Sequence, residues 1–429
     1  MSWETVGKWM GWLLLAGYAA LTLKELPRYF RSALVSPLEA REERAPAPGR
    51  RLWLWVFLAF LASRALVALV CAVGWWIESG SLEHFFQVFS DRLYPWDAWH
   101  YIDIIQNGYV TEGDPRLFIV FFPFFPLVCR CLTFMTGLPA APVAFAVSNA
   151  ALLGCGAAMW RLVEMDGGED AGRRAMLLLM FCPMTYFFSI PYSESTFLLA
   201  TLLAVLFARR RRFVLAVAFG AMASGARLLG MATAIPIFWE LLAARREAVA
   251  GREAPLTGNA LAKGVALCVL KVLPVSLGFL SYLCLNWRLF GNPTQFMVFQ
   301  SEHWFQNFGD IGNTFRYSLC NALDYDDFLY RLGVWWPQVA LLIAVPLLIF
   351  WRRRHEQPGD VAYALVYHYV AFAPTWLLSG ARYAACNYAL WPMLARIPRR
   401  RRTFVIILAL ECALLVYMTW VGLWKGKVY

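Results

Sequence analysis

The chain has 429 residues, of which 60% are hydrophobic and 16% are charged. A soluble domain has about 45–50% apolar and about 25% charged residues, so this composition excludes an ordinary soluble protein. The 39 Lys and Arg exceed the 28 Asp and Glu by 11, but the arginines gather in short runs between apolar stretches. That arrangement is typical of the cytoplasmic loops of a membrane protein and argues against a nucleic-acid-binding surface.

An apolar run at residues 9–23 opens the chain, and basic residues follow it at once. Removal of this run as a signal peptide would leave the basic residues to be translocated, so we expect an uncleaved anchor helix. Residues 1–51 form the first of three predicted regions, the anchor followed by a basic cytoplasmic linker at 36–51. The apolar run at 52–77 is long enough to cross a bilayer core of about 30 Å, and it takes the chain to the outer side.

The outer side then holds a polar, aromatic-rich loop at 78–117, which is too long to be a simple connection. Four apolar stretches follow, at 118–136, 142–162, 175–190 and 195–208. An odd number of crossings must separate this loop from the cytoplasmic arginines at 209–212. One stretch must therefore be broken or re-entrant, which requires a backbone that lines a cavity. The proline-interrupted segments 121–126 and 183–191 are the two candidates.

The remaining stretches complete an all-α, polytopic transmembrane helical bundle. Residues 213–226 and 228–242 predict two short helices that run out and back around Arg227. A span at 264–289 leads to a second large outer loop at 291–333. Further spans are expected at 334–350, at 361–378 and after 402. The second predicted region is therefore 52–290, and the third is 291–429.

The first outer loop carries the strongest candidate for a catalytic group. From Asp97 onward the residues suit a helix, so Asp97, His100 and Tyr101 share one face. Trp96 has the kind of ring that collects at the water–lipid boundary, which would hold Asp97 at the depth of a lipid phosphate. The alternative is that Asp97 only caps the helix, as Asp often does.

Other candidate residues interrupt the later apolar stretches or lie in the second outer loop. Glu194 and Arg227 are ionisable groups within apolar surroundings, where a charge is costly and marks a functional site. The alternative for this pair is a salt bridge that only fixes helix packing. Arg382, at the outer end of a predicted span, is a further cation. His303 and Trp304 could meet a phosphate and the face of a sugar, or make ordinary loop contacts.

Metal and cofactor sites are not indicated by the sequence. The ten cysteines and five histidines show no ligand spacing. Most of the cysteines lie inside apolar runs, where a free cysteine behaves as a small hydrophobe. We therefore expect neither a metal nor a cofactor.

Several of these residues occur in blocks that form one ordered pattern. The blocks are Trp96-Asp97-x-x-His100-Tyr101, Phe121-Phe122-Pro123, Tyr192-Ser193-Glu194-Ser195, Ala226-Arg227-x-x-Gly230, Phe290-Gly291-x-Pro293 and Arg382-Tyr383. In this order they resemble the glycosylphosphatidylinositol mannosyltransferase II family and its prokaryotic relatives, within the GT-C superfamily of membrane glycosyltransferases. The resemblance runs from residue 52 to residue 394. One departure is that Leu228 and Leu229 follow Arg227, where the family usually has a serine or proline next to the arginine.

The resemblance implies a GT-C fold and an inverting transfer of mannose on the extracytoplasmic side. The donor would be a polyprenyl- or dolichyl-phosphate-mannose, and the acceptor would be a glycolipid or glycan. The chain would also contact the lipids of the membrane that it spans. Trp96 and Asp97 would be essential, and His100 and Tyr101 would contact the substrate. In a prokaryote, the membrane would be the plasma membrane.

An inverting displacement needs one general base, because the acceptor hydroxyl loses its proton as it attacks. Asp97 is the candidate base. Arg227 and Arg382 would stabilise the leaving phosphate, with His303 in support. Glu194 would orient a hydroxyl or pair with an arginine.

Two other functions remain open at this point. A flippase or transporter of lipid-linked sugars also uses buried charges and broken helices, although no internal repeat is evident in this chain. A GT-C transferase could also take a different polyprenyl-linked sugar, since the choice of sugar depends on a few contacts to its hydroxyls.

Overall fold

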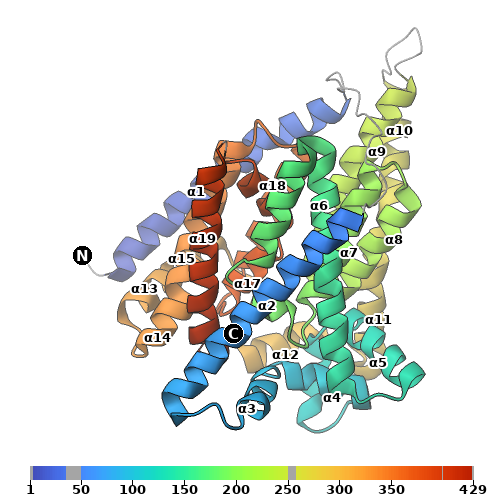
Figure 1. The fold of residues 1–429 in the computed structure, drawn as a ribbon. Helices are drawn as coiled ribbons and strands as arrows, with labels where there is room; N and C mark the ends of the chain where they lie inside the picture. The colour runs from blue at the N-terminus through green and yellow to red at the C-terminus, as the bar shows by residue number, and fades with distance from the viewer. Residues whose placement is uncertain (1–2, 35–49, 250–257, 399, 428–429) are drawn as a thin grey trace.

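The computed structural model describes residues 3–34, 50–249, 258–398 and 400–427, and in these ranges the chain is helical apart from short connections (Figure 1). Within them, the only β-type pairing is an isolated bridge between Phe308 and Pro374. Seven helices among the described residues are long and apolar enough to cross a membrane, or eight if one bent pair counts as a span. The predicted all-α, multi-pass membrane architecture is confirmed. The predicted linker at 36–51 lies mostly outside the described residues.

The helices divide into long, membrane-length elements and shorter ones. The long elements are α1 (Trp3–Leu34), α2 (Arg50–Ser79), α6 (Ala140–Met180), η3 with α9 (Leu228–Thr233 and Ala234–Val249), α10 with α11 (Asn259–Val272 and Leu277–Phe290), α14 to α15 (Phe328–Tyr330 and Trp336–Arg352) and α19 with η6 (Arg401–Met418 and Thr419–Trp424). The shorter ones are α3 (Phe85–Arg92), α4 (Ala98–Asn107), α5 (Phe124–Thr136), α7 (Glu194–Arg209), α8 (Phe213–Ala226), α12 (Gln295–Trp304), α13 (Ile311–Asp324), α16 (Pro358–Phe372), α17 (Gly380–Ala385) and α18 (Leu390–Ala395). The second outer loop is thus largely helical, and the predicted span at 361–378 is helical only to Phe372.

Helix α6 folds back on itself at Gly168, whose φ of 77° lies in the left-handed region that favours glycine. A Cβ added at Gly156 would lie 2.3 Å from Met180 Cε, so the two halves of α6 pack against each other. In one continuous helix these residues would be about 36 Å apart. The second half ends at Met180, because Pro183 follows and a proline cannot continue the hydrogen-bonded ladder. The apolar stretch predicted at 175–190 therefore continues α6 only as far as Met180, and its second half is not part of that helix.

Both proline-interrupted segments are broken, whereas the crossing count required only one broken stretch. The 3₁₀ helix η1 (Asp114–Val120) meets α5 at an angle of 115°. After α6, the chain forms the 3₁₀ helix η2 (Thr185–Phe188) and then enters α7. The last residue of α7, Arg209, donates to the carbonyl oxygen of Leu162 in the first half of α6. Hence the segment from Gly168 to Arg209 enters the bundle and returns to the same end.

The out-and-back pair around Arg227 is also present. Helix α8 leads away from the Arg209 end, and α9 returns to it, where Arg211 bonds Glu240 of α9 at 2.8 Å. The break between the two helices requires Gly230, since a Cβ there would lie 2.1 Å from the carbonyl carbon of Ala223. No side chain fits such a contact, so η3 can fold against α8 only with glycine at this position.

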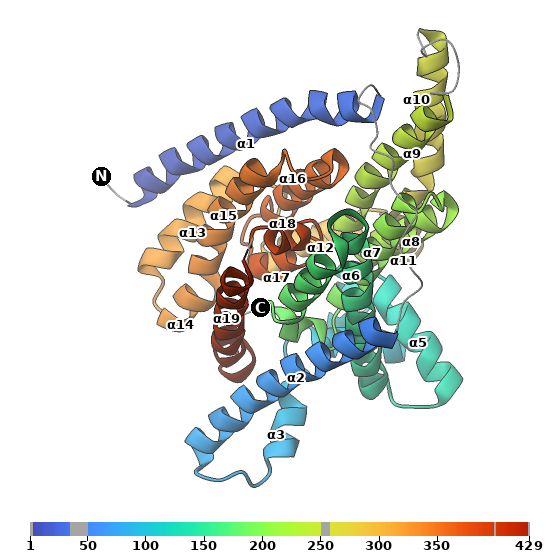
Figure 2. The ribbon, with the colours of Figure 1, turned by 45° about the horizontal axis from the view of Figure 1, so that its top comes forward.

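The two ends of the bundle differ in character (Figures 1 and 2). The short helices α3, α4, α5 and α12 gather at the lower end of Figure 1, and α9 and α10 project at the opposite end. Helix α1 packs across α13 and α16. This crossing is close, because a Cβ at Gly11 would lie 2.3 Å from the carbonyl oxygen of Gly312. The lower end is where several of the short helices meet.

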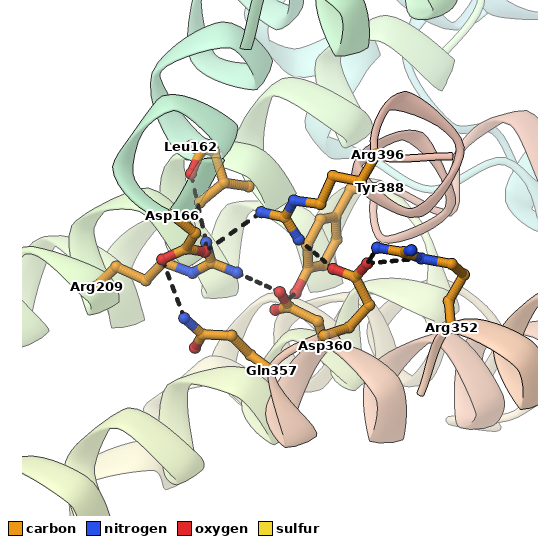
Figure 3. A network of polar contacts seen from close by, with 9 residues as sticks. Leu162, Asp166, Arg209, Arg352, Gln357, Asp360, Tyr388 and Arg396 are labelled. Atoms are coloured by element: carbon orange, nitrogen blue, oxygen red, sulfur yellow. Dashed lines mark hydrogen bonds and ion pairs between the residues drawn. The ribbon is translucent and has the colours of Figure 1, made fainter. Parts of the chain in front are cut away.

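A charge network ties α6, α7, α15, α16 and α18 together at the Gly168 turn (Figure 3). Its charged members are Asp166, Arg209, Arg352, Glu356, Asp360 and Arg396. Three arginines thus face three carboxylates. The Tyr388 hydroxyl donates to Asp360 Oδ1 at 2.7 Å, and Gln357 Nε2 donates to Asp166 Oδ1 at 3.1 Å. This region is a closed set of compensated charges.

Candidate active site

A cavity of about 730 Å³ lies among α4, the start of α7, the break between α8 and η3, α12 and α17. Helices α4 and α12 belong to the lower end of Figure 1. Eight of the nine predicted site residues line the cavity: Trp96, Asp97, His100, Tyr101, Glu194, Arg227, Trp304 and Arg382. These residues come from five separate parts of the sequence. The ninth, His303, is exposed and does not line the cavity; its ring packs against Phe299 and Trp304.

Asp97 occupies the N-cap position of α4, but its side chain makes no capping hydrogen bond. Helix capping therefore does not account for the carboxylate. The carboxylate is 29% exposed, and its Oδ1 lies 3.6 Å from His100 Nδ1. The preceding residue, Trp96, has a φ of 44°, a strained value for a residue with a bulky side chain. Strain of this kind concentrates at functional sites, where the surrounding structure maintains it.

Two tyrosines fix the Asp97 segment to the entry of α7. The Tyr192 hydroxyl accepts the backbone N–H of Asp97 at 3.1 Å, and the Tyr101 hydroxyl donates to Ser193 Oγ at 3.0 Å. Burial raises the pKa of the Tyr101 phenol, so this hydroxyl stays protonated and acts as a donor. The loop that carries Asp97 is therefore tied directly to the turn that carries Glu194.

Glu194 faces two arginines on the inner wall of the cavity. Its Oε1 lies 2.5 Å from Arg227 Nη1 and 3.2 Å from Arg382 Nε. The three side chains are 1%, 15% and 6% exposed for Glu194, Arg227 and Arg382 respectively. Glu194 Oε2 and Arg382 Nη1 are buried, and neither has a hydrogen-bond partner among the described residues. One carboxylate against two guanidinium groups leaves one positive charge in excess, at a cavity wall.

Aromatic rings surround these arginines without neutralising them. The Arg382 guanidinium carbon lies 5.0 Å from the ring centres of both Phe187 and Tyr192. The Arg227 guanidinium carbon lies 4.6 Å from the ring centre of Tyr383. Ring faces stabilise a cation through their quadrupole, and they keep its full charge available to an anion. The arrangement can therefore hold a phosphate. The described residues contain no group of three or more His, Cys, Asp or Glu side chains that could hold a metal ion.

Local backbone breaks place both members of the Glu194–Arg227 pair. Glu194 is the first residue of α7, where the helix dipole favours a negative charge. Arg227 has an extended backbone, with φ −159° and ψ 150°, between α8 and η3. Both charges thus lie where a helix is interrupted inside the bundle.

The comparison with known families decides what kind of protein carries this cavity. The family model described as Mannosyltransferase (PIG-V) matches residues 62–283, more than half of the chain. The chain belongs to this family. The predicted resemblance is confirmed, and the match includes Asp97, Glu194 and Arg227, whereas Trp304 and Arg382 lie beyond it.

Other comparisons with this chain give weaker likenesses. No curated protein matches it. The crystal structure of ArnT from Cupriavidus metallidurans bound to undecaprenyl phosphate is 15% identical, with a TM-score of 0.46, over 84% of this chain and 63% of that one. The apo oligosaccharyltransferase from Archaeoglobus fulgidus is 11% identical, with a TM-score of 0.43, over 87% of this chain and 56% of that one. The chain thus spans less than two thirds of the length of either structure.

Arg64 lies within the mannosyltransferase match, and sequence reasoning missed it. Its Nη1 donates to the Thr185 carbonyl oxygen at 3.0 Å and also to Ser189 Oγ, and its Nη2 donates to Thr185 Oγ1 at 3.1 Å. Arg64 thus holds η2, whose Phe187 stacks on Trp96 at 5.9 Å between ring centres. An arginine inside the apolar run of α2 was the available signal, because such a residue marks a functional or structural contact.

Proposed function

We propose that this chain is an inverting GT-C mannosyltransferase that takes mannose from a polyprenyl- or dolichyl-phosphate carrier. The acceptor would be a glycolipid or glycan hydroxyl on the extracytoplasmic side. One observation carries the proposal: the Asp97 carboxylate shares a cavity with an arginine pair that has one positive charge in excess. A base and an anion site in one cavity are the two parts that this reaction requires.

Asp97 is the proposed general base. The acceptor oxygen attacks the anomeric carbon while Asp97 takes the hydroxyl proton, and the bond from the anomeric carbon to the phosphate oxygen breaks. The electron pair of that bond leaves with the phosphate, and the proton passes from Asp97 to water. His100 Nδ1, 3.6 Å from Asp97, is close enough to orient the carboxylate or the incoming hydroxyl.

Arg227 and Arg382 are the proposed phosphate site. The donor is a phosphodiester with one negative charge, and the leaving polyprenyl phosphate gains a second. A fixed positive charge in a water-poor cavity therefore interacts more strongly with the transition state than with the bound donor, which lowers the barrier. Glu194 holds both guanidinium groups in place before the donor arrives.

The proposed orientation places the cavity on the outer side of the membrane. The arginine run at 209–212 and the charge network lie at the opposite end of α7 from Glu194. Because cytoplasmic loops carry the excess of arginine, the end with the network would face the cytoplasm. In a prokaryote, the cavity would then open outside the plasma membrane.

Purified protein in lipid nanodiscs tests this proposal. Incubation with a glycolipid acceptor and polyprenyl-phosphate-mannose that carries a labelled sugar should yield labelled glycolipid of inverted anomeric configuration and free polyprenyl phosphate. The Asp97→Asn variant is the matched control, since it keeps the shape of the side chain and removes the base. Movement of intact donor across the bilayer without cleavage would instead identify a flippase. Transfer from a polyprenyl-phosphate-glucose or -arabinose, with none from the mannose donor, would correct the sugar.

A further inference from the structure

The cavity has a charged inner wall and an uncharged rim. Glu194 and Arg382 on the inner wall are almost fully buried, with 1% and 6% of their side chains exposed. The rim near α12 carries three amides, Gln300, Gln306 and Asn307, all of which line the cavity and are partly or fully exposed. Trp304 lines the cavity beside them. A ligand that extends from the inner wall to the opening thus contacts charged groups at its inner end and amides at its outer end.

The amides are held in fixed positions. Gln300 Nε2 donates to Gln306 Oε1 at 2.7 Å, and Gln306 Nε2 donates to the Trp376 carbonyl oxygen at 3.2 Å. Within the part of the chain that the structure describes, Gln300 Oε1 and the Asn307 side-chain amide have no hydrogen-bond partner. They offer a ligand one acceptor from Gln300, and both an acceptor and donors from Asn307.

A short backbone clasp supports this rim. The Thr375 N–H donates to the Asn307 carbonyl oxygen at 2.8 Å, and the Asn307 N–H donates to Thr375 Oγ1 at 2.9 Å. The bridge between Phe308 and Pro374 continues the pairing. The clasp fixes Asn307 before any ligand binds, which lowers the ordering cost of binding.

The rim also lies on the Asp97 side of the cavity. The ring of Trp304 meets the ring of Phe121 edge to face at 6.2 Å between centres, and Phe121 lies 5.3 Å from the ring centre of His100. His100 in turn neighbours Asp97. A ligand held at the rim therefore has a short path for one of its hydroxyls to the proposed base.

We propose that Gln300, Trp304 and Asn307 form a binding site for a neutral, hydroxyl-rich sugar headgroup, which is the acceptor of the proposed transfer. Each amide pairs with a hydroxyl as donor, acceptor or both, and the Trp304 ring offers an apolar face to the sugar. The three side chains carry no positive charge with which to pair a phosphate. The identification of the sugar as the acceptor rests on the proposed function, whereas the site itself does not.

Equilibrium binding of three labelled octyl compounds to the full chain in nanodiscs tests the site. Octyl α-mannoside carries a neutral sugar, octyl phosphate carries an anion, and octanol reports partition into the lipid. The variants are Gln300→Leu and Asn307→Ala. The matched control is Glu302→Gln, because Glu302 is exposed on the same helix and does not line the cavity. Asn307 is itself exposed, so its truncation should not disturb folding.

Octyl α-mannoside should bind more tightly than octanol, and each rim variant should weaken it about fivefold, which corresponds to about 1 kcal/mol for one hydrogen bond. Octyl phosphate binding should be unchanged in both rim variants and in Glu302→Gln, and should fall in Arg382→Met. If octyl α-mannoside binds no better than octanol, or equally well to the rim variants, the proposed site is overturned. If it binds as expected but no sugar is transferred in the donor assay, the proposed function fails and the sugar site remains.

Discussion

The charge network at the Gly168 turn and the arginine pair in the cavity are both buried polar clusters, but their charges are compensated differently. In the network, three arginines face three carboxylates, and Tyr388 and Gln357 complete the bonding (Figure 3). In the cavity, Glu194 alone faces Arg227 and Arg382. The first cluster is complete as it stands, and the second has capacity for an anion.

This difference separates stability from function. A buried charge without a partner is costly, so a fold keeps one only where something else requires it. The network has no such surplus, and it joins five helices at one end of the bundle. The arginine pair has a surplus positive charge in the same cavity as the Asp97 carboxylate. Substitutions in the two regions should therefore have different consequences, and the following predictions test that separation.

The largest expected effect is at Asp97. Asp97→Asn should lower the rate of mannose transfer by about 10²–10⁴-fold, because a positioned general base contributes that much. Its melting temperature should match that of the wild type, since the Asp97 side chain makes no capping bond. Initial rates and thermal unfolding of the same preparation measure both quantities. Undiminished turnover would eliminate Asp97 as the base.

A substitution in the charge network should lower the stability of the fold and leave the catalytic rate unchanged. Arg209→Met leaves Asp166 and Asp360 without this partner in a buried setting, where breaking a pair costs about 3–5 kcal/mol. We expect a lower melting temperature and an unchanged kcat per folded molecule at low temperature. An equal melting temperature, or a loss of kcat with full stability, would remove the distinction between the two regions.

The arginine pair should show the reverse behaviour. Arg227→Ala should lower kcat/KM for the donor by about 10²-fold, as the loss of one group that stabilises developing charge commonly does. Arg211→Ala is a suitable control, because Arg211 also pairs with glutamates but lies at the other end of α8. Donor kinetics that are the same in both variants would place the phosphate elsewhere.

A smaller effect is expected at Arg64, which acts on the cavity through η2. Arg64→Met should lower kcat about tenfold with little change in donor KM, since a displaced catalytic group slows the chemical step. Arg64→Lys keeps the charge and a donor, and should recover part of the loss. A change in melting temperature alone, with kcat unaffected, would assign Arg64 a purely structural role.

Features that depend on neighbouring residues could be predicted from the sequence. Asp97, His100 and Tyr101 share a face because their spacing is helical, and all three line the cavity. The breaks in the two segments follow from their prolines, whereas the crossing count required only one of them. Family membership could also be predicted, because the blocks that carry it are local in sequence.

Features that depend on distant contacts could not be predicted. The sequence predicts that Glu194 orients a hydroxyl or pairs with an arginine, but it does not show that Arg382 of α17 is a partner, because only the packed bundle brings these helices together. The sequence also does not distinguish His303 from Trp304, although only Trp304 lines the cavity. The antiparallel packing within α6 depends on a single glycine conformation at Gly168.

Helix α7 joins the two regions, since Glu194 is its first residue and Arg209 its last. A helix of this length is a rod of about 24 Å that fixes the rotation of one end relative to the other. One inserted or deleted residue would turn the ends by about 100° relative to each other, and Glu194 and Arg209 could then no longer reach their partners together. The length of α7 should therefore be invariant among relatives that use both clusters, even where its apolar side chains differ.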